Sequence, residues 1–138
     1  MLALFKGQQA RSIQQADGAV DLVCAFEVLE HLPFDKFERA VSEIARVTRK
    51  NAIVSLPHFS PPVQFLLKIP FLKEFRFSFK IPFPRKHAFN GQHYWEIGKK
   101  EYPLKRIMTI LEKYFEIQKE YVPFENQYHH FFVLSCHR

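Results

Sequence analysis

Glycine, cysteine and long apolar runs are all scarce in this sequence of 138 residues. Only 4 glycines occur, and no G-x-G pattern is present. The sequence therefore lacks a glycine-rich loop of the kind that lets a backbone approach a nucleotide closely. The 2 cysteines, Cys24 and Cys136, lie in apolar, strand-like segments. We interpret them as buried thiols in a reducing cytoplasm and not as a disulfide framework.

Membrane-spanning and secretory segments are also missing from the pattern. No uncharged apolar stretch approaches the ~18 residues that a membrane-spanning helix needs. The first 12 residues contain a short apolar run without a small-residue cleavage pattern, so they do not resemble a secretory signal. Apolar residues make up 47% and charged residues 25% of the chain, which is typical of a soluble globular protein and excludes a wholly disordered one.

What the chain has in excess is phenylalanine and positive charge, and both are concentrated in its middle. The chain has 16 phenylalanines and a net charge of +6. Residues 57–101 hold 8 basic and 3 acidic side chains, 8 of the 16 phenylalanines and 6 of the 9 prolines, whereas residues 1–56 are neutral. We therefore predict a single domain over residues 1–138 in which residues 57–101 are an insertion with a separate role.

A strand, a helix and a second strand are predicted before this insertion. Residues 20–26 form the short continuous apolar run of a strand buried in a parallel sheet. Residues 35–51 have the apolar spacing of an amphipathic helix, with Asp35 expected to cap its start and Asn51 to end it in the left-handed conformation. Residues 52–56 are a second buried strand, so the three elements predict a βαβ unit.

Within and beyond the insertion, three more elements are predicted. Residues 75–81 alternate apolar with cationic or polar side chains, which predicts a strand with one apolar and one cationic face. A helix is expected from Pro103 to about Phe115. Residues 116–122 and 131–136 predict an antiparallel hairpin. The predicted fold class is α/β.

The βαβ unit before the insertion resembles a known family. Residues 21–33, DLVCAFEVLEHLP, and residues 53–57, IVSLP, resemble class I S-adenosylmethionine-dependent methyltransferases, and more narrowly the type 11 group of quinone and small-molecule methyltransferases. The resemblance covers nearly all of residues 12–138. It implies the fourth strand, the next helix and the fifth strand of a seven-stranded Rossmann-like sheet. The terminal hairpin is similar to strands six and seven, so strands four, five, seven and six would lie side by side.

The resemblance also implies S-adenosylmethionine as the cofactor. Ala25, Phe26 and Glu27 end the fourth strand, where backbone groups would meet the methionine part of the cofactor. Gln9 and Ala10 stand where the family commonly has Asp-Ala against the adenine. The family's glycine-rich loop and the acidic residue of its second strand are missing. The chain thus resembles the C-terminal half of a methyltransferase, as a shortened gene product, a natural truncation or a fragment of a longer protein.

A half-domain of this kind raises the question of its partners. Residues 2–6 are interpreted as a remnant of the third strand, which leaves the fourth strand as an apolar edge where the first strand should pair. Unpaired edges invite association. We therefore expect a homodimer, or pairing with a separate N-terminal half.

Two histidines are the candidate catalytic bases. His58 follows the fifth strand at the same rim as the cofactor residues, and His93 lies in the insertion. Methyl transfer needs an aligned nucleophile and a group that accepts its proton, and the pKa of an imidazole suits that role. A structural role remains the alternative for each. Residues 93–96 are similar to the family's His/aromatic segment, so Tyr94, Trp95 and Glu96 are assigned to the acceptor.

A metal site is a further candidate. Glu27, Glu30 and His31 have the spacing i, i+3, i+4, so one helical turn can bring two carboxylates and an imidazole together around a divalent cation. A similar E-x-x-E-H binds Mg²⁺ in some RNA-end and quinone-ring methyltransferases. The alternative is that Glu30 and His31 hydrogen-bond the loop locally. His129 and His130 are interpreted as solvated, because no third ligand stands at a recognisable spacing.

Three roles are open for the insertion. It can be a substrate lid with an apolar lining, or it can touch an anionic membrane surface. Nucleic-acid binding is the least favoured, because the alternation puts phenylalanines and cations on opposite faces. The sequence therefore predicts methyl transfer to an oxygen, nitrogen or carbon of a small, lipophilic acceptor. The alternative is a non-catalytic interaction module, or a half-domain that needs a partner chain to bind the cofactor.

Overall fold

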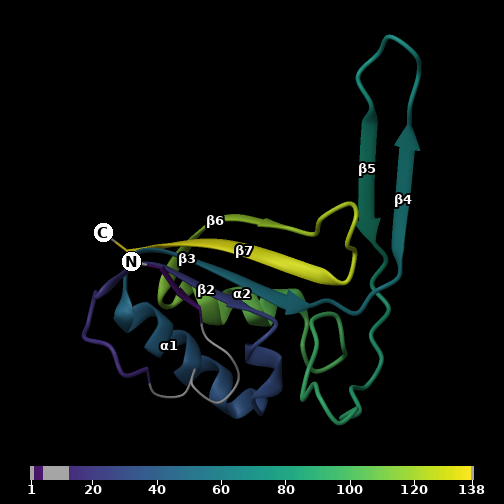
Figure 1. Ribbon diagram of the computed structural model, residues 1–138. Coiled ribbons are helices and arrows are strands. Elements are labelled where there is room, and N and C mark those ends of the chain that lie inside the picture. Colours follow the sequence, from purple (N-terminus) through teal and green to yellow (C-terminus); the bar gives the residue numbers. More distant parts are fainter. Residues whose placement is uncertain (1, 5–12, 138) are drawn as a thin grey trace.

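The computed structural model describes residues 2–4 and 13–137 (Figure 1). Its centre is a five-stranded sheet in the order β1-β2-β3-β7-β6, and a two-stranded sheet, β4-β5, stands apart from it. The strands of the main sheet are β1 (Leu2–Leu4), β2 (Val20–Phe26), β3 (Thr48–Pro57), β6 (Phe115–Tyr121) and β7 (His129–Cys136).

The sheet confirms the predicted α/β class and the predicted neighbours. β2 pairs with β3 in parallel, and β7 pairs antiparallel with both β3 and β6. The equivalents of strands four, five, seven and six therefore lie side by side. Phe26 is in register with Ser55, so the carboxyl ends of β2 and β3 lie next to each other.

The prediction that the fourth-strand equivalent is a free edge is wrong. β1 pairs in parallel with β2, with Leu2 opposite Leu22. The N-terminal segment is a strand, as expected, but it takes the place beside β2 that was assigned to the missing first strand. Backbone donors and acceptors of a buried strand cost free energy when they are unpaired, which explains why an available segment fills this edge.

Two helices cover one face of the sheet (Figure 1). α1 (Phe37–Val47) contacts β3, and α2 (Leu104–Glu112) contacts β6 and α1. Two 3-10 turns, η2 (Leu29–His31) and η3 (Phe34–Lys36), lead into α1. The core residues under the helices are fully buried and include Val23, Ala52, Val54, Leu56, Phe132 and Leu134. On the opposite face of the strands, Leu22, Ile53, Phe131 and Val133 are only half-buried.

The first helix, α1, is shorter at both ends than the helix predicted over residues 35–51. Asp35 lies in the 3-10 turn before α1, and no side chain among the described residues caps the helix at Lys36. Asn51 is a strand residue and not a left-handed helix end, because β3 begins at Thr48 and Asn51 pairs with Leu22 and Ser135. Ladder hydrogen bonds to two neighbouring strands replace the capping interactions that the local sequence favours.

The insertion contains a long hairpin that stands away from the main sheet (Figure 1). β4 (Pro62–Leu67) pairs antiparallel with β5 (Phe75–Lys80). The strand predicted at residues 75–81 is confirmed, whereas its partner was not predicted. Further along, residues 93–97 return to the body, where Trp95 and Ile97 are fully buried. Among the described residues, no helix has the length and apolar character needed to cross a bilayer.

Candidate functional site

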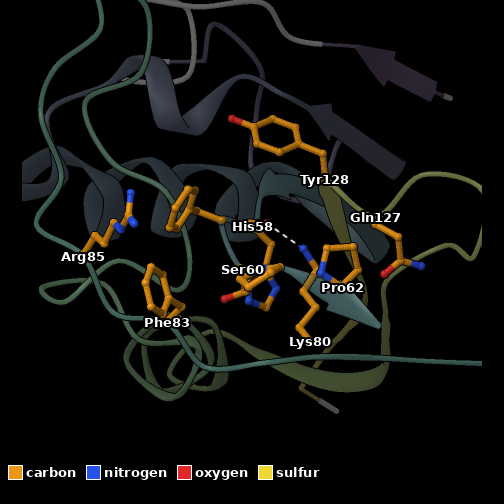
Figure 2. Close-up of a pocket in the computed structure, with 10 residues that line it drawn as sticks. His58, Ser60, Pro62, Lys80, Phe83, Arg85, Gln127 and Tyr128 are labelled. Atoms are coloured by element: carbon orange, nitrogen blue, oxygen red, sulfur yellow. Dashed lines mark hydrogen bonds between the residues drawn. The ribbon is translucent and has the colours of Figure 1, made fainter. Parts of the chain in front are cut away.

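A cavity of about 460 Å³ lies at the carboxyl end of β3, at the base of the hairpin (Figure 2). Its lining joins the apolar rings of Phe59, Pro62 and Phe83 to the cations Lys80 and Arg85. Adjoining cavities of about 480 and 360 Å³ share residues with it. Open α/β sheets bind ligands outside the carboxyl ends of their strands, so this cavity is the candidate acceptor site.

His58 is part of a buried hydrogen-bond chain beside this cavity. Its Nδ1 lies 2.9 Å from Nδ1 of His130, and Nε2 of His130 contacts the carboxylate of Glu120. Only 9% of His58 and 3% of His130 is exposed. The three residues come from the end of β3, from β7 and from β6, so the order of strands in the sheet brings them together.

The hydrogen bonds that join His58, His130 and Glu120 indicate which ring nitrogens of the two histidines carry protons. A carboxylate can only accept, so Glu120 accepts the proton on Nε2 of His130, and Nδ1 of His130 is left as an acceptor. Nδ1 of His58 then donates to it, which leaves Nε2 of His58 unprotonated. That nitrogen can take a proton from a bound acceptor.

Lys80 places a cationic side chain beside His58 in the cavity lining. Its Nζ donates to the carbonyl of His58 at 2.6 Å, as the dashed line in Figure 2 shows. Burial lowers the pKa of Lys80 to about 8. Burial, together with the charges of Lys80 and His130, lowers the pKa of His58 to about 3. His58 is therefore a neutral imidazole at physiological pH.

A second polar cluster joins His93, Glu96 and Tyr128. Nδ1 of His93 lies 3.1 Å from Oε1 of Glu96, and the Tyr128 hydroxyl donates to the same oxygen at 2.8 Å. Burial opposes ionisation of Glu96, but the hydrogen bonds from His93 and Tyr128 outweigh it and lower the pKa of Glu96. The carbonyl of Tyr128 accepts from the His58 backbone N–H at 2.7 Å, which links the two clusters.

The aromatic pair assigned to the acceptor is divided between surface and core. Tyr94 is 42% exposed and packs against Phe89 with the two rings tilted. Trp95 is fully buried, packs against Phe37 and donates its Nε1 proton to the Leu32 carbonyl at 3.1 Å. Neighbouring residues of an extended segment point in opposite directions, and Trp95 takes the inward position. Its contacts give it a structural role and place it away from the cavity lining.

The predicted metal residues are brought together in a changed combination. Glu30, His31 and His93 offer ligand atoms that lie within 4.8 Å of one another. Glu27 is not part of this cluster. Glu30 is fully buried, and neither of its carboxylate oxygens has a hydrogen-bond partner among the described residues. Burial, with smaller contributions from the Glu27 and Glu96 charges, raises the pKa of Glu30 to about 8.

The end of β2 carries the predicted cofactor residues. Ala25 is buried, while Phe26 is 45% exposed at the rim. Glu27 has a left-handed φ of 49°, and its side chain accepts a hydrogen bond from the Ser55 hydroxyl at 2.9 Å. That conformation costs a non-glycine residue ~1 kcal/mol, and such strain is concentrated at functional sites. Gln9 and Ala10 lie outside the described residues.

The sequence interpretation missed several residues of the site. The prediction that His130 is solvated is wrong. His130 is buried because it shares the inward face of β7 with Phe132 and Leu134. That period-two pattern is visible in the sequence and could have placed it. Glu120 and Lys80 carry no such signal, since only the pairing of distant strands brings them to His58.

The comparisons with known proteins agree with this architecture. A family model described as a methyltransferase domain matches residues 4–56, the part that contains β2, α1 and all but the last residue of β3. No curated protein matches the chain at a significant level.

Solved methyltransferases have a similar fold. A Methanosarcina mazei S-adenosylmethionine-dependent methyltransferase is 16% identical with a TM-score of 0.52, over 96% of this chain and 66% of its own. The Burkholderia thailandensis 1,6-didemethyltoxoflavin-N1-methyltransferase, solved with 1,6-didemethyltoxoflavin and S-adenosylhomocysteine, is 12% identical with a TM-score of 0.54, over 92% and 48%. A glycopeptide N-methyltransferase solved with S-adenosylhomocysteine is 8% identical with a TM-score of 0.54, over 98% and 61%.

These likenesses define the class of the fold. The chain has part of the Rossmann-like fold of class I S-adenosylmethionine-dependent methyltransferases. It spans about half to two thirds of the length of these solved structures.

Proposed function

We propose that this chain is the acceptor-binding part of an S-adenosylmethionine-dependent methyltransferase that acts on a small, lipophilic acceptor. The observation that carries the proposal is the chain from His58 through His130 to Glu120 beside an apolar-lined cavity. The partial methyltransferase fold and the family match over residues 4–56 support it. Phenylalanine and proline in the lining favour an apolar acceptor.

The residues of this chain would align the acceptor and remove its proton. S-adenosylmethionine supplies a methyl group on a sulfonium; the bond from acceptor to methyl forms as the sulfur–carbon bond breaks, and S-adenosylhomocysteine leaves. When the attacking atom carries a proton, Nε2 of His58 takes it. Nδ1 of His58 keeps its hydrogen bond to His130, which is held in turn by Glu120, so this hydrogen-bonded relay keeps the His58 ring oriented towards the acceptor.

His93 is the second candidate for the base. Its ring contacts Glu96 and the Tyr128 hydroxyl, which hold it in place. In the loaded enzyme, replacing the true base should lower kcat by about a hundredfold or more. We expect this from His58→Asn, with a much smaller effect from His93→Asn. The reverse order would transfer the role to His93.

Only part of a cofactor site is present among these residues. Phe26 exposes an aromatic ring at the rim, and an aromatic face attracts a sulfonium cation. Ala25 and Glu27 stand beside it at the end of β2. The sequence has no glycine-rich loop to complete the site.

Calorimetric titration of the chain with S-adenosylhomocysteine tests the enzyme proposal against its rival, a non-catalytic interaction module. Micromolar binding that Phe26→Ala weakens would support a cofactor site at the end of β2. Absence of heat at millimolar ligand would favour the module, or a half-domain that needs a partner chain.

We also propose that Glu30, His31 and His93 bind a divalent cation. The supporting observation is the buried carboxylate of Glu30, which has no hydrogen-bond partner among the described residues and whose Oε1 lies 3.6 Å from Nε2 of His31. One carboxylate with two imidazoles suits Zn²⁺ or Mn²⁺ better than Mg²⁺, which prefers oxygen ligands. The donor set therefore argues against the Mg²⁺ that the E-x-x-E-H pattern predicts.

Thermal melting with each of the three cations tests this site. Zn²⁺ or Mn²⁺ should raise Tm, and Mg²⁺ should have little effect. Glu30→Gln should abolish the rise, while Glu43→Gln on α1 is the matched control that should keep it. An equal rise in both variants would place the binding elsewhere, and no rise with any cation would refute the proposal.

The open face of the sheet supports the prediction of a partner. Leu22, Ile53, Phe131 and Val133 are half-buried on the side away from α1 and α2. We propose that an N-terminal half, or a second copy of this chain, covers this face.

A further inference from the structure

One face of the β4–β5 hairpin is entirely apolar. Directly opposed residues of antiparallel strands lie on the same face, and three such pairs are Val63 with Phe79, Phe65 with Phe77, and Leu67 with Phe75. All six side chains are exposed, from 38% for Val63 to 55% for Phe75. We call these six residues the apolar face of the hairpin.

The opposite face of the hairpin holds it to the body. Gln64 donates to the Phe124 carbonyl, and Arg76 forms an ion pair with Glu125. Gln127 donates to the Ser78 hydroxyl at 3.3 Å. These contacts with the turn between β6 and β7 fix which way the hairpin is turned. The apolar face is therefore the one presented to the surroundings.

The tip of the hairpin extends this apolar surface. Ile69, Phe71 and Leu72 are exposed, and Phe71 is 107% exposed with a left-handed φ of 69°. A bulky side chain in that conformation is an outlier, because glycine or asparagine adopts it at lower cost. Full exposure means that Phe71 gives the fold no burial in return, so its presence points to a ligand outside the chain.

The charges around the tip select the kind of surface that fits. Lys68 and Lys73 flank the tip, are exposed and form no ion pair with any residue in the described ranges. Glu74 is the single acidic residue in the sequence of residues 62–81, and Arg76 pairs with it. An apolar tip flanked by cations matches a layer that is apolar inside and anionic at its surface.

We propose that the β4–β5 hairpin docks on an anionic phospholipid bilayer, with its tip and apolar face in the boundary between headgroups and acyl chains. A second copy of the chain is a poorer occupant, because it would bring two cationic tips together. The cavity at His58 lies at the base of the same hairpin, beside Pro62 and Lys80. An acceptor dissolved in the bilayer would therefore enter the site from the membrane; this consequence rests on the proposed function, whereas bilayer docking does not.

Co-sedimentation with phosphatidylcholine vesicles, with and without phosphatidylglycerol, tests the proposal. Binding should require phosphatidylglycerol and weaken as salt is raised. Phe71→Ser combined with Phe77→Ser should lower the partition coefficient by about tenfold per side chain. The matched control is Phe89→Ser, since Phe89 is 56% exposed but lies outside the hairpin. Its partition should stay within about twofold of the parent chain, which is within the scatter of surface substitutions.

A charge series separates the electrostatic contribution. Lys68→Gln with Lys73→Gln should reduce binding to the anionic vesicles by about tenfold or more, at ~1 kcal/mol per cation near the surface. Lys100→Gln with Lys105→Gln removes the same charge from positions outside the hairpin and should have a smaller effect. Melting curves of all variants should match the parent chain, because the mutated side chains are exposed.

Several outcomes would overturn the inference. One is no vesicle binding at millimolar lipid, and another is binding that the hairpin variants leave unchanged. A third is a dimer in sedimentation velocity that Phe71→Ser with Phe77→Ser dissociates while vesicle binding is absent, which would assign the apolar face to a second copy. If the parent chain binds vesicles but does not bind S-adenosylhomocysteine, only the proposed function is refuted.

Discussion

At the scale of single residues, the site depends on groups held in states that water would not favour. His58 is kept neutral by burial beside Lys80, and the carboxylate of Glu30 is buried without a hydrogen bond from any described residue. Glu27 and Phe71 have left-handed backbones that cost free energy. These four residues lie at the rim, in the proposed metal cluster and at the hairpin tip, and not in the core under the helices.

The depressed pKa of His58 predicts how stability depends on pH. An unfolded histidine titrates near its usual pKa of 6.5, whereas folded His58 titrates at about 3. Protonation therefore favours the unfolded chain. The stabilisation from neutral His58 is complete above pH ~7 and is lost progressively as the pH falls from there towards the folded pKa of about 3. His58→Asn should make Tm fall less steeply between about pH 7 and pH 5. The control His137→Asn removes an exposed histidine and should keep the parent slope; equal slopes in all three chains would contradict the assignment.

Gly98 gives a steric prediction beside the same cavity. Its φ is +87°, and an added Cβ would lie 2.1 Å from the Phe59 carbonyl oxygen and 3.2 Å from the His58 ring. Gly98→Ala should lower the free energy of unfolding by about 2 kcal/mol or more. Gly91 has a φ of +90° with open space around it, so Gly91→Ala should show only the backbone cost of ~1 kcal/mol. Equal losses in denaturant titrations would remove the steric explanation.

At the scale of secondary-structure elements, the molecule has a cooperative body and an appended hairpin. α1 and α2 pack on the sheet through fully buried side chains such as Phe37 and Leu111. β4 and β5 pair with each other and belong to a separate sheet. The hairpin should therefore contribute little to the stability of the body.

Removing the hairpin tests this division. Replacing residues 63–79 by a short glycine-serine link between Pro62 and Lys80 should leave Tm nearly unchanged, because few buried contacts are lost. Phe37→Ala removes a fully buried ring from α1 and should cost about 3–5 kcal/mol. Thermal melts of both variants provide the comparison. A large loss of Tm without the hairpin would show that it is part of the cooperative core.

At the scale of the whole molecule, the chain is a sheet with one covered face and one edge closed by a short strand. β1 has 3 residues and lies beside β2. Without it, the β2 edge would expose unpaired donors and acceptors, which promotes association. With this edge closed by β1, the half-buried face of the sheet is where the proposed partner would join.

Deleting residues 1–4 should therefore increase association. We expect a higher weight-average mass in sedimentation velocity than for the full chain at the same concentration, because the β2 edge becomes available for pairing. Deleting residues 137–138 at the other end of the chain is the control and should leave the mass distribution unchanged. A shorter chain that sediments like the full chain would show that β1 does not protect this edge.

The local sequence was enough to predict the elements whose periodicity is strong. The apolar runs at residues 20–26 and 52–56 predicted two buried strands, and the amphipathic spacing between them predicted α1. It was not enough for their ends, since Asn51 has the local preference of a helix end but pairs with residues of β2 and β7. Long-range ladder bonds decide such positions, and no local pattern contains them.

What the sequence determined by itself is the βαβ unit, the charge and phenylalanine content of the insertion, and the placing of His58 at the rim. The tertiary structure decided which polar groups meet there. His130 and Glu120 reach His58 because β7 inserts between β3 and β6, and His93 replaces Glu27 beside Glu30 because residues 93–97 pack back on the body. The physical reason is that side-chain chemistry is a property of the residue, whereas proximity between distant residues is set by how the sheet and the core are assembled.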